Sequence, residues 1–194
     1  MAPRPEQLGL RERKKLRTRA AIRTEAMRLF ETQGYEATTI EQIAEAAEVS
    51  PSTFFRYFPS KERVVMADDL DDPTIAALER IPLEVPPLAA FRQAFETTLA
   101  GMSEEQVELE LARSRLMFRV PALRAAFADE LYRSIEFAVE ILARRLDRDP
   151  DDPGLRVLVG AMTGAVLAMA GTAPEDLRYP IRALELLEAG LPVG

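Results

Sequence analysis

The chain has 194 residues, 47% of them hydrophobic, and a formal net charge of −7. This length and apolar content suit one domain, or two small ones, with a packed core, and they argue against wholesale disorder. The sequence contains no Cys, His or Trp. Disulfides, thiol nucleophiles and thiolate zinc sites are therefore excluded, and the commonest general base is missing. We predict no catalytic residue, no metal site and no cofactor.

The negative net charge hides an uneven distribution. Residues 1–23 carry eight basic and two acidic side chains, whereas residues 64–194 carry 13 basic and 23 acidic ones. Such a split indicates that the two parts face different partners. No secretory signal is evident, and the longest apolar run, over 157–173, is shorter than the roughly 20 residues of a membrane span. We therefore expect a cytoplasmic protein with no membrane partner.

Hydrophobic periodicity is helical nearly throughout, which predicts an all-α fold of about nine helices. The first predicted helix spans residues 10–33 and ends at Gly34, a favourable C-terminal cap. Its buried face is a stripe at helical spacing: Ile22, Ala26, Leu29 and Phe30.

Short polar residues mark the starts of the next three predicted helices. Thr39 with Gln42 forms a capping-box pattern before a helix over 40–47. Ser50 followed by Pro51 predicts a third helix over 51–57, with Phe54 and Phe58 in the core. Ser60 predicts a fourth helix from Lys61 to about Leu70.

The rest of the chain predicts five more helices and no strand. They span 88–100, a segment from Ser103 to about Arg119, a long segment after Pro121, 154–171 and 174–189. We expect residues 1–62 to form a helix-turn-helix domain with a basic N-terminal arm, and residues 63–194 to form a helical bundle.

The second and third helices have the pattern of a helix-turn-helix. Ala44 and Ala47 allow two helices to approach closely, and Val49 fills the turn. The third helix opens with Pro51, Ser52 and Thr53. Small polar residues at a helix N-terminus let amides and hydroxyls approach phosphates and base edges, and the major groove admits one helix. The pair therefore predicts a DNA-binding element.

Residues 37–62, ATTIEQIAEAAEVSPSTFFRYFPSKE, closely resemble the DNA-binding domain of the TetR family of transcriptional regulators. Residues 26–35 resemble that family's first helix, so the resemblance covers about residues 12–65. The FFRYF form at 54–58 resembles the regulators of acyl-compound and mycofactocin-type systems. The resemblance implies a homodimeric, ligand-responsive repressor. Such a protein binds a palindromic operator and is released by a small apolar or amphipathic effector.

The resemblance also implies residue roles in DNA binding. In the family, the turn and the third helix contact the operator, and the lysine that opens the fourth helix contacts a phosphate. The matching residues here are Thr39, Ser50, Pro51, Ser52, Thr53, Phe55, Tyr57 and Lys61. The family usually has Gly where this chain has Glu48, and often Tyr where it has Phe55.

The basic N-terminal run suggests further DNA contacts. We expect Arg13, Lys14 and Arg17 to pair with phosphates, an interaction that is independent of base sequence and sensitive to salt. The alternative is a solvated and frayed terminus, because charge runs often have no partner.

Reading a palindrome requires two recognition helices about 34–36 Å apart, so a homodimer is implied. Residues 157–170 are apolar on nearly every face, which is unusual for a monomer surface. We expect the last two helices to form the interface through Gly160, Gly164, Ala168, Gly171, Ile181, Leu184 and Leu187. The alternative is that these residues form the core of one chain.

The resemblance implies an effector pocket among the middle helices. Met and aromatic side chains suit an apolar ligand, and Arg115 and Arg119 would meet an anionic headgroup or bridge to surface glutamates. The expected pocket residues are Phe91, Phe95, Leu99, Met102, Arg115, Phe118, Arg119, Phe127, Tyr132 and Met162.

Two other function classes are alternatives to a ligand-responsive repressor. A helical enzyme would need a catalytic or metal-binding cluster, but adjacent acids such as Glu104 and Glu105 do not face each other on a helix. A DNA-binding regulator without a small-molecule ligand, controlled by a protein partner, is the second alternative. A solid core in place of a pocket would favour it.

Overall fold

The structure is a computed structural model that describes residues 9–67, 70–172 and 175–191. Within these residues it contains ten helices and no strand, which confirms the all-α prediction. The chain divides into two compact units, Met1–Asp68 with Arg115–Ala126, and Asp69–Ser114 with Phe127–Gly194. The first unit thus includes a segment from the middle of the chain, which the sequence did not predict.

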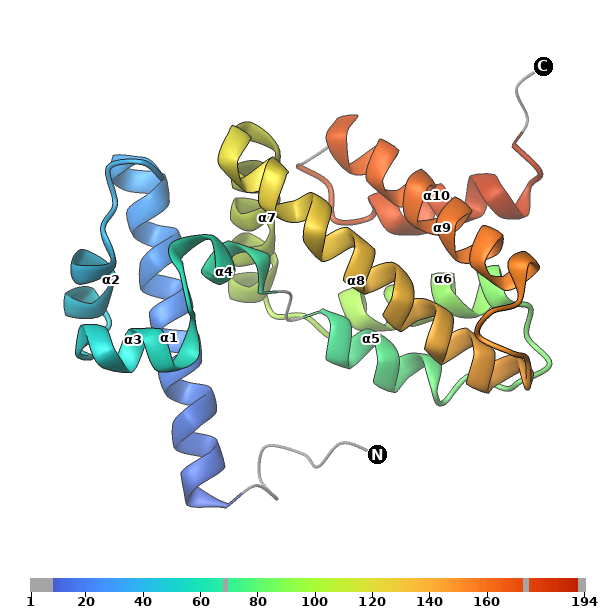
Figure 1. The fold of residues 1–194 in the computed structure, drawn as a ribbon, viewed down its shortest axis with the longest axis horizontal. Helices are drawn as coiled ribbons and strands as arrows, with labels where there is room; N and C mark the ends of the chain where they lie inside the picture. Colours follow the sequence, from blue (N-terminus) through green and yellow to red (C-terminus); the bar gives the residue numbers. More distant parts are fainter. Residues whose placement is uncertain (1–8, 68–69, 173–174, 192–194) are drawn as a thin grey trace. The chain divides into compact units, whose positions relative to one another are not determined.

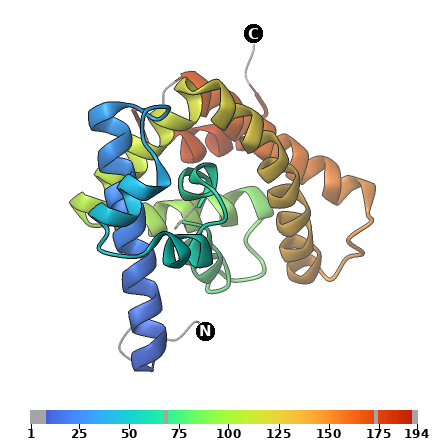
Figure 2. The same cartoon turned by 60° about the vertical axis from the view of Figure 1, so that its left-hand side comes forward.

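The first unit contains four consecutive helices: α1 (Leu10–Gln33), α2 (Ile40–Ala46), α3 (Pro51–Tyr57) and α4 (Lys61–Met66). Helices α2 and α4 contact α1, and α3 contacts α2. The core contains the predicted Ile22, Phe30, Phe54 and Phe58. Figures 1 and 2 show the first turns of α1 extending beyond α2 to α4. Residues 10–17 of that extension are exposed.

Three predicted caps fix the starts of these short helices. The Thr39 hydroxyl accepts a hydrogen bond from the Gln42 amide, and the Gln42 side chain accepts one from the Thr39 amide, so the capping box is complete. Ser50 caps α3 through the Thr53 amide, and Ser60 caps α4 through the Arg63 amide. Helices of six or seven residues depend on such caps because they are too short to be stable alone.

The second unit is a bundle of helices. It contains α5 (Asp71–Leu78), α6 (Pro87–Ala100), α9 (Pro153–Thr172) and α10 (Tyr179–Glu188). Most of α7 (Glu104–Arg119) and α8 (Pro121–Leu146) also belongs to it. Helix α10 contacts both α9 and α6, and α5 contacts α6. The hydrophobic core of the second unit contains Val139, Leu142, Leu155 and Val159.

Two elements differ from the sequence prediction. The expected fourth helix ends at Met66, and a separate helix, α5, starts at Asp71. Pro73 suggested a break, but it lies in the first turn of α5, where the missing N–H has no intrahelical partner to lose. The last helix begins at Tyr179 rather than 174, because Asp176 accepts a hydrogen bond from the Arg178 amide in a turn.

Candidate nucleic-acid interface

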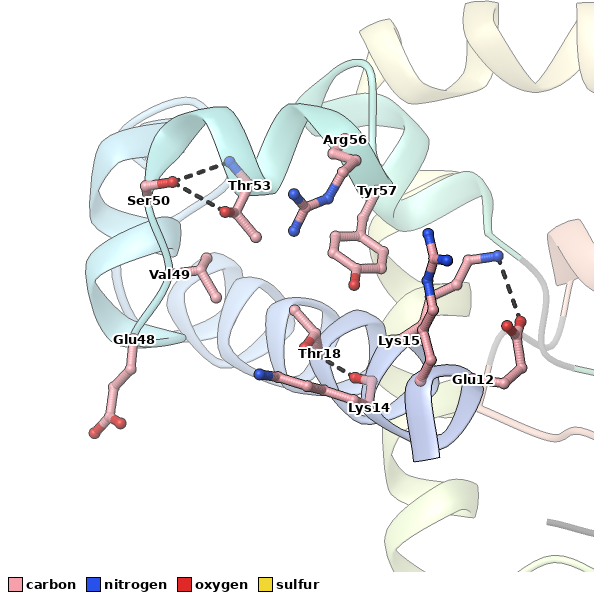
Figure 3. A pocket seen from close by; sticks show the side chains of 11 residues that line it. Glu12, Lys14, Lys15, Thr18, Glu48, Val49, Ser50, Thr53, Arg56 and Tyr57 are labelled. Atoms are coloured by element: carbon pink, nitrogen blue, oxygen red, sulfur yellow. Dashed lines mark hydrogen bonds and ion pairs between the residues drawn. The ribbon is translucent and has the colours of Figure 1, made fainter. Parts of the chain in front are cut away.

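A groove of about 910 Å³ lies between the N-terminal half of α1 and helix α3 in the first unit. Figure 3 shows Arg56 and Tyr57 pointing from α3 toward α1. One wall is α1, and the other is α3 with the turn before it. The lining residues are Arg11, Glu12, Lys14, Lys15, Thr18, Glu48, Val49, Ser50, Thr53, Arg56 and Tyr57.

The groove has an excess of positive charge. Four basic side chains line it, Arg11, Lys14, Lys15 and Arg56, against two acidic ones. One acid, Glu12, lies 3.5 Å from the Lys15 ammonium. Both of these side chains are well exposed, so this pair contributes little stability and leaves Lys15 available to a stronger anion. The lining suits a polyanion that crosses from α1 to α3.

The basic residues of α1 that face the groove share one side of the helix. Arg11, Lys14, Lys15 and Thr18 follow the i, i+3, i+4, i+7 spacing of a helical face. Arg13 and Arg17, which we expected to bind phosphates, are exposed but do not line the groove. They lie out of phase with this face, so the groove gives no support for phosphate contacts by these two residues.

Hydroxyl groups gather at the N-terminus of α3. The Ser50 hydroxyl lies 2.9 Å from that of Ser52 and 3.0 Å from that of Thr53, and it accepts a hydrogen bond from the Thr53 amide. Ser50, Thr53 and Tyr57 line the groove as expected. Pro51, Ser52 and Phe55 are exposed outside it, and Thr39 is exposed at the N-terminus of α2. The Phe55 side chain is 51% exposed, so it is free to contact a partner.

Glu48 occupies the turn between α2 and α3 with a φ of 53°. This left-handed conformation costs a residue with a side chain roughly 1–2 kcal/mol, which explains why the family usually has Gly here. Its carboxylate points away from the space between the helices (Figure 3). The turn is therefore strained at Glu48.

Lys61 binds its own chain more closely than expected for a phosphate contact. Its ammonium donates hydrogen bonds to the backbone carbonyl oxygens of Tyr35 at 2.7 Å and Thr38 at 3.0 Å. It also lies 4.2 Å from the centre of the Tyr35 ring, a cation–π contact. Lys61 does not line the groove. In this arrangement Lys61 is an anchor that joins α4 to the loop between α1 and α2, which gives no support for the expected phosphate contact.

Glu62 completes this anchor. Its carboxylate accepts a hydrogen bond of 2.8 Å from the Tyr35 hydroxyl. Partial burial raises the pKa of Glu62, but hydrogen bonds from Ser60, the backbone and Tyr35, with the Lys61 charge, outweigh it and lower the pKa below the ordinary value. Burial, together with the Glu62 carboxylate, raises the pKa of Tyr35 well above the ordinary range. The pair therefore favours a neutral tyrosine beside a charged glutamate.

The second unit contains a cavity of about 190 Å³ formed by α5, α6, α8, α9 and α10. Three of the expected pocket residues line it: Phe91, Phe95 and Met162. Leu99, Met102, Phe127 and Tyr132 do not line it, and Tyr132 is 74% exposed. Arg115, Phe118 and Arg119 belong to the first unit, and Arg115 pairs with Glu31 at 3.0 Å. This cavity therefore gives no support for the expected pocket role of these seven residues.

Helix α9 exposes a stripe of small residues. Gly160, Gly164 and Ala168 are exposed, and a Cβ atom added at either glycine would meet nothing within 4 Å. The surroundings of Gly171 lie outside the described residues. Ile181 and Leu184 are buried in the core of their own chain, so they cannot supply a dimer surface as expected, whereas Leu187 is half-buried.

In the described parts of the chain, α9 is the one helix with the length and composition to cross a membrane. From the sequence, we expected the apolar run 157–173 to be too short for a membrane span. The helix is longer than that run because it begins at Pro153. Only 22% of the window Pro153–Ala170 is buried. The exposed positions of this window are mostly small residues, and Val157 is the one large apolar side chain among them.

Two family models match the chain. The model described as "Bacterial regulatory proteins, tetR family" matches residues 22–67, and the model described as "MftR C-terminal domain" matches residues 85–192. The second match covers more than half of the chain and agrees with the subgroup expected from residues 54–58.

Individual relatives and solved structures similar to this chain are also transcriptional regulators. The transcriptional regulator TcmR of Streptomyces glaucescens is 41% identical over 177 residues, which cover 84% of this chain and 77% of TcmR. The TetR-family repressor FadR of Thermus thermophilus, solved with lauroyl-CoA, is 26% identical with a TM-score of 0.52, covering 91% of this chain and 96% of that one. NalD of Pseudomonas aeruginosa, a repressor of the MexAB-OprM efflux pump, shares the fold with a TM-score of 0.54 at 22% identity, covering 91% and 95%. The chain belongs to the TetR family of transcriptional regulators.

Proposed function

We propose that the protein is a homodimeric repressor that binds a palindromic operator in the cytoplasm and leaves it when a small effector binds. The observation that carries this proposal is the basic groove between α1 and α3. It combines cations for the phosphates with the hydroxyls of Ser50 and Thr53 at the start of the recognition helix. Phosphate contacts fix the register of a protein on DNA, and groups at base edges supply specificity.

The proposed phosphate contacts are Arg11, Lys14, Lys15 and Arg56, and the proposed contacts to bases and sugars are Ser52, Thr53, Phe55 and Tyr57. Phe55 lacks a hydroxyl, but its exposed ring suits a thymine methyl group. Thr39, Ser50 and Pro51 are proposed to approach the backbone near the N-termini of α2 and α3.

The dimer is proposed to form through the exposed face of α9, with Gly160, Gly164 and Ala168, and through Leu186 and Leu187 of α10. Val157 and Leu186 are 69% and 45% exposed, so both apolar side chains are accessible to a partner. Small residues permit two α9 helices to approach closely. This surface also explains the span-like composition of α9 without a membrane.

An effector is proposed to act by a population shift. It must bind better to a state whose recognition helices are wrongly spaced for the operator, because a ligand with equal affinity for both states regulates nothing. The complex of FadR with lauroyl-CoA supports effector binding within this fold. The cavity in the second unit favours a small molecule over the alternative of a protein partner.

Selection of bound fragments from genomic DNA at about 0.15 M salt tests the DNA-binding part of the proposal, a salt level at which non-specific binding is weak. We expect enrichment of a short palindrome whose half-sites lie one helical turn or a multiple of it apart. Enrichment of a single half-site would contradict the dimer. No enrichment, from protein refolded to remove bound ligand, would contradict operator binding.

A further inference from the structure

The cavity of the second unit restricts the chemical class of its ligand, and this inference rests on the proposed ligand-responsive function. Its volume is about 190 Å³. An apolar cavity of about 150 Å³ holds one benzene molecule. The space therefore suits a single six-membered ring with one or two small substituents.

The described part of the lining is mostly apolar and offers no positive charge. Ten of its 14 residues are apolar, and the one charged residue among these is Asp71, which is exposed. The arginine next to Phe91, Arg92, is held by Glu96 at 2.9 Å and Glu188 at 3.1 Å. Burying a carboxylate or phosphate without a cation is strongly unfavourable. The cavity therefore disfavours anions.

A buried hydroxyl pair sets the hydrogen-bond polarity of the cavity wall. Thr74 lines the cavity and is 7% exposed, and its Oγ1 lies 3.1 Å from Oγ1 of Thr98. The Thr98 hydroxyl donates its proton to the Ala94 carbonyl oxygen at 2.9 Å. A hydroxyl has one proton, so Thr74 must be the donor between the two threonines.

This proton count leaves Thr74 without a proton for a ligand. Its oxygen retains a free lone pair, so it accepts a hydrogen bond from a group in the cavity. We infer that the cavity takes a small, uncharged, single-ring molecule that carries a hydroxyl or N–H donor, and that Thr74 selects this donor.

Titration calorimetry on the full chain with three matched probes tests the inference. p-Cresol has a donor, p-xylene replaces the hydroxyl with a methyl group, and 4-methylbenzoate adds a negative charge. We expect p-cresol to bind about five-fold more tightly than p-xylene, the equivalent of one ordinary hydrogen bond. The benzoate is expected to bind at least about a hundred-fold more weakly than p-cresol, because its charge has no partner.

Two threonine variants test whether the preference for p-cresol over p-xylene comes from the Thr74 hydroxyl. Thr74→Val should reduce the preference for p-cresol over p-xylene to about one-fold, because the acceptor is gone while Thr98 keeps its bond to Ala94. Thr97→Val makes the same change at an exposed position of α6 outside the lining and should leave the preference unaltered. Equal loss in both variants would overturn the role of Thr74.

A third variant tests the direction of the hydrogen bond. In Thr98→Val the Thr74 proton loses its acceptor, so p-tolunitrile, which only accepts hydrogen bonds, should bind about five-fold more tightly than to the wild type. Unchanged nitrile affinity would show that Thr74 is not the donor in the native pair.

The outcomes separate this inference from the proposed function, because DNA binding is measured in parallel on the same protein. Tight binding of 4-methylbenzoate, or no binding of any probe, by protein that still binds its operator overturns the ligand class alone. Binding of p-cresol by protein that binds no DNA overturns the proposed function and leaves the ligand class intact.

Discussion

Glu48 shows how one residue can carry both strain and charge. Its left-handed conformation predicts that Glu48→Gly raises the free energy of unfolding by about 1 kcal/mol. Glu48→Gln removes the charge but keeps the strain, so its stability should stay near that of the wild type. Because Glu48 lines the basic groove, both variants should bind DNA more tightly. Chemical denaturation and operator titration measure the two effects, and equal stability of the Gly and Gln variants would contradict the strain.

The Tyr35–Glu62 hydrogen bond predicts how stability depends on pH. The pKa of Glu62 is lowered, so its contribution is present above the ordinary value of 4.5 and is lost as the pH falls below it. The pKa of Tyr35 is raised, so its contribution is present below the ordinary value of 10.0 and is lost as the pH rises above it.

Two substitutions separate the contributions of Glu62 and Tyr35 to the dependence of stability on pH. Thermal melts between about pH 3 and 11 measure this dependence. Glu62→Gln keeps an acceptor for Tyr35 and should flatten the acid side. Tyr35→Phe should flatten the alkaline side and lower stability at pH 7 by about 1–2 kcal/mol, because it removes a hydrogen bond to a charged group. An unchanged profile in both variants would rule out this pair as its source.

At the scale of elements, Lys61 connects α4 to the loop between α1 and α2. Lys61→Ala should lower stability, because two backbone carbonyl oxygens lose their donor and the cation–π contact is lost. It should leave the salt dependence of DNA binding unchanged, since the ammonium neutralises no phosphate in this arrangement. A loss of about 0.9 in the slope of log K against log salt would restore its role as a phosphate contact.

The helices of the first unit were predictable because their signals are local. Thr39, Ser50 and Ser60 bond to amides three residues away, so sequence spacing alone identifies them. Helix α5 was missed because Pro73 has the same appearance in a first turn and in a break. The face of α1 that lines the groove could also have been predicted. Its residues Arg11, Lys15 and Thr18 continue the helical spacing of the buried stripe at Ile22 and Ala26 toward the N-terminus.

The cavity was less predictable because five helices distant in sequence build it. Phe91, Phe95 and Met162 were expected, but Ile75 and Ile141 also line it, on faces that no local pattern separates from ordinary core. Composition likewise could not show that Arg115 pairs with Glu31, or that Leu184 is fully buried. The cavity lining, this ion pair and the burial of Leu184 depend on how the helices pack, and a single sequence does not predict that packing.

At the scale of the whole molecule, the dimer should depend on the exposed face of α9. Gly164→Glu adds a charged side chain where a Cβ meets no atom of the same chain, so the fold should be retained. The dimer should dissociate, and operator affinity should fall at least about a hundred-fold because one recognition helix is lost from each complex. Thr97→Glu, at an exposed position of α6 outside the proposed interface, is the control. Sedimentation that shows an intact Gly164→Glu dimer would move the interface elsewhere.

The salt dependence of operator binding shows whether the groove between α1 and α3 binds the DNA backbone. Lys14 and Arg13 are adjacent, exposed and equally charged, but only Lys14 lines the groove. Lys14→Ala should reduce the magnitude of the slope of log K against log salt by about 0.9, as expected for one phosphate contact. Arg13→Ala should leave the slope unchanged. Equal reductions in the two variants, or a reduction in Arg13→Ala alone, would contradict the account.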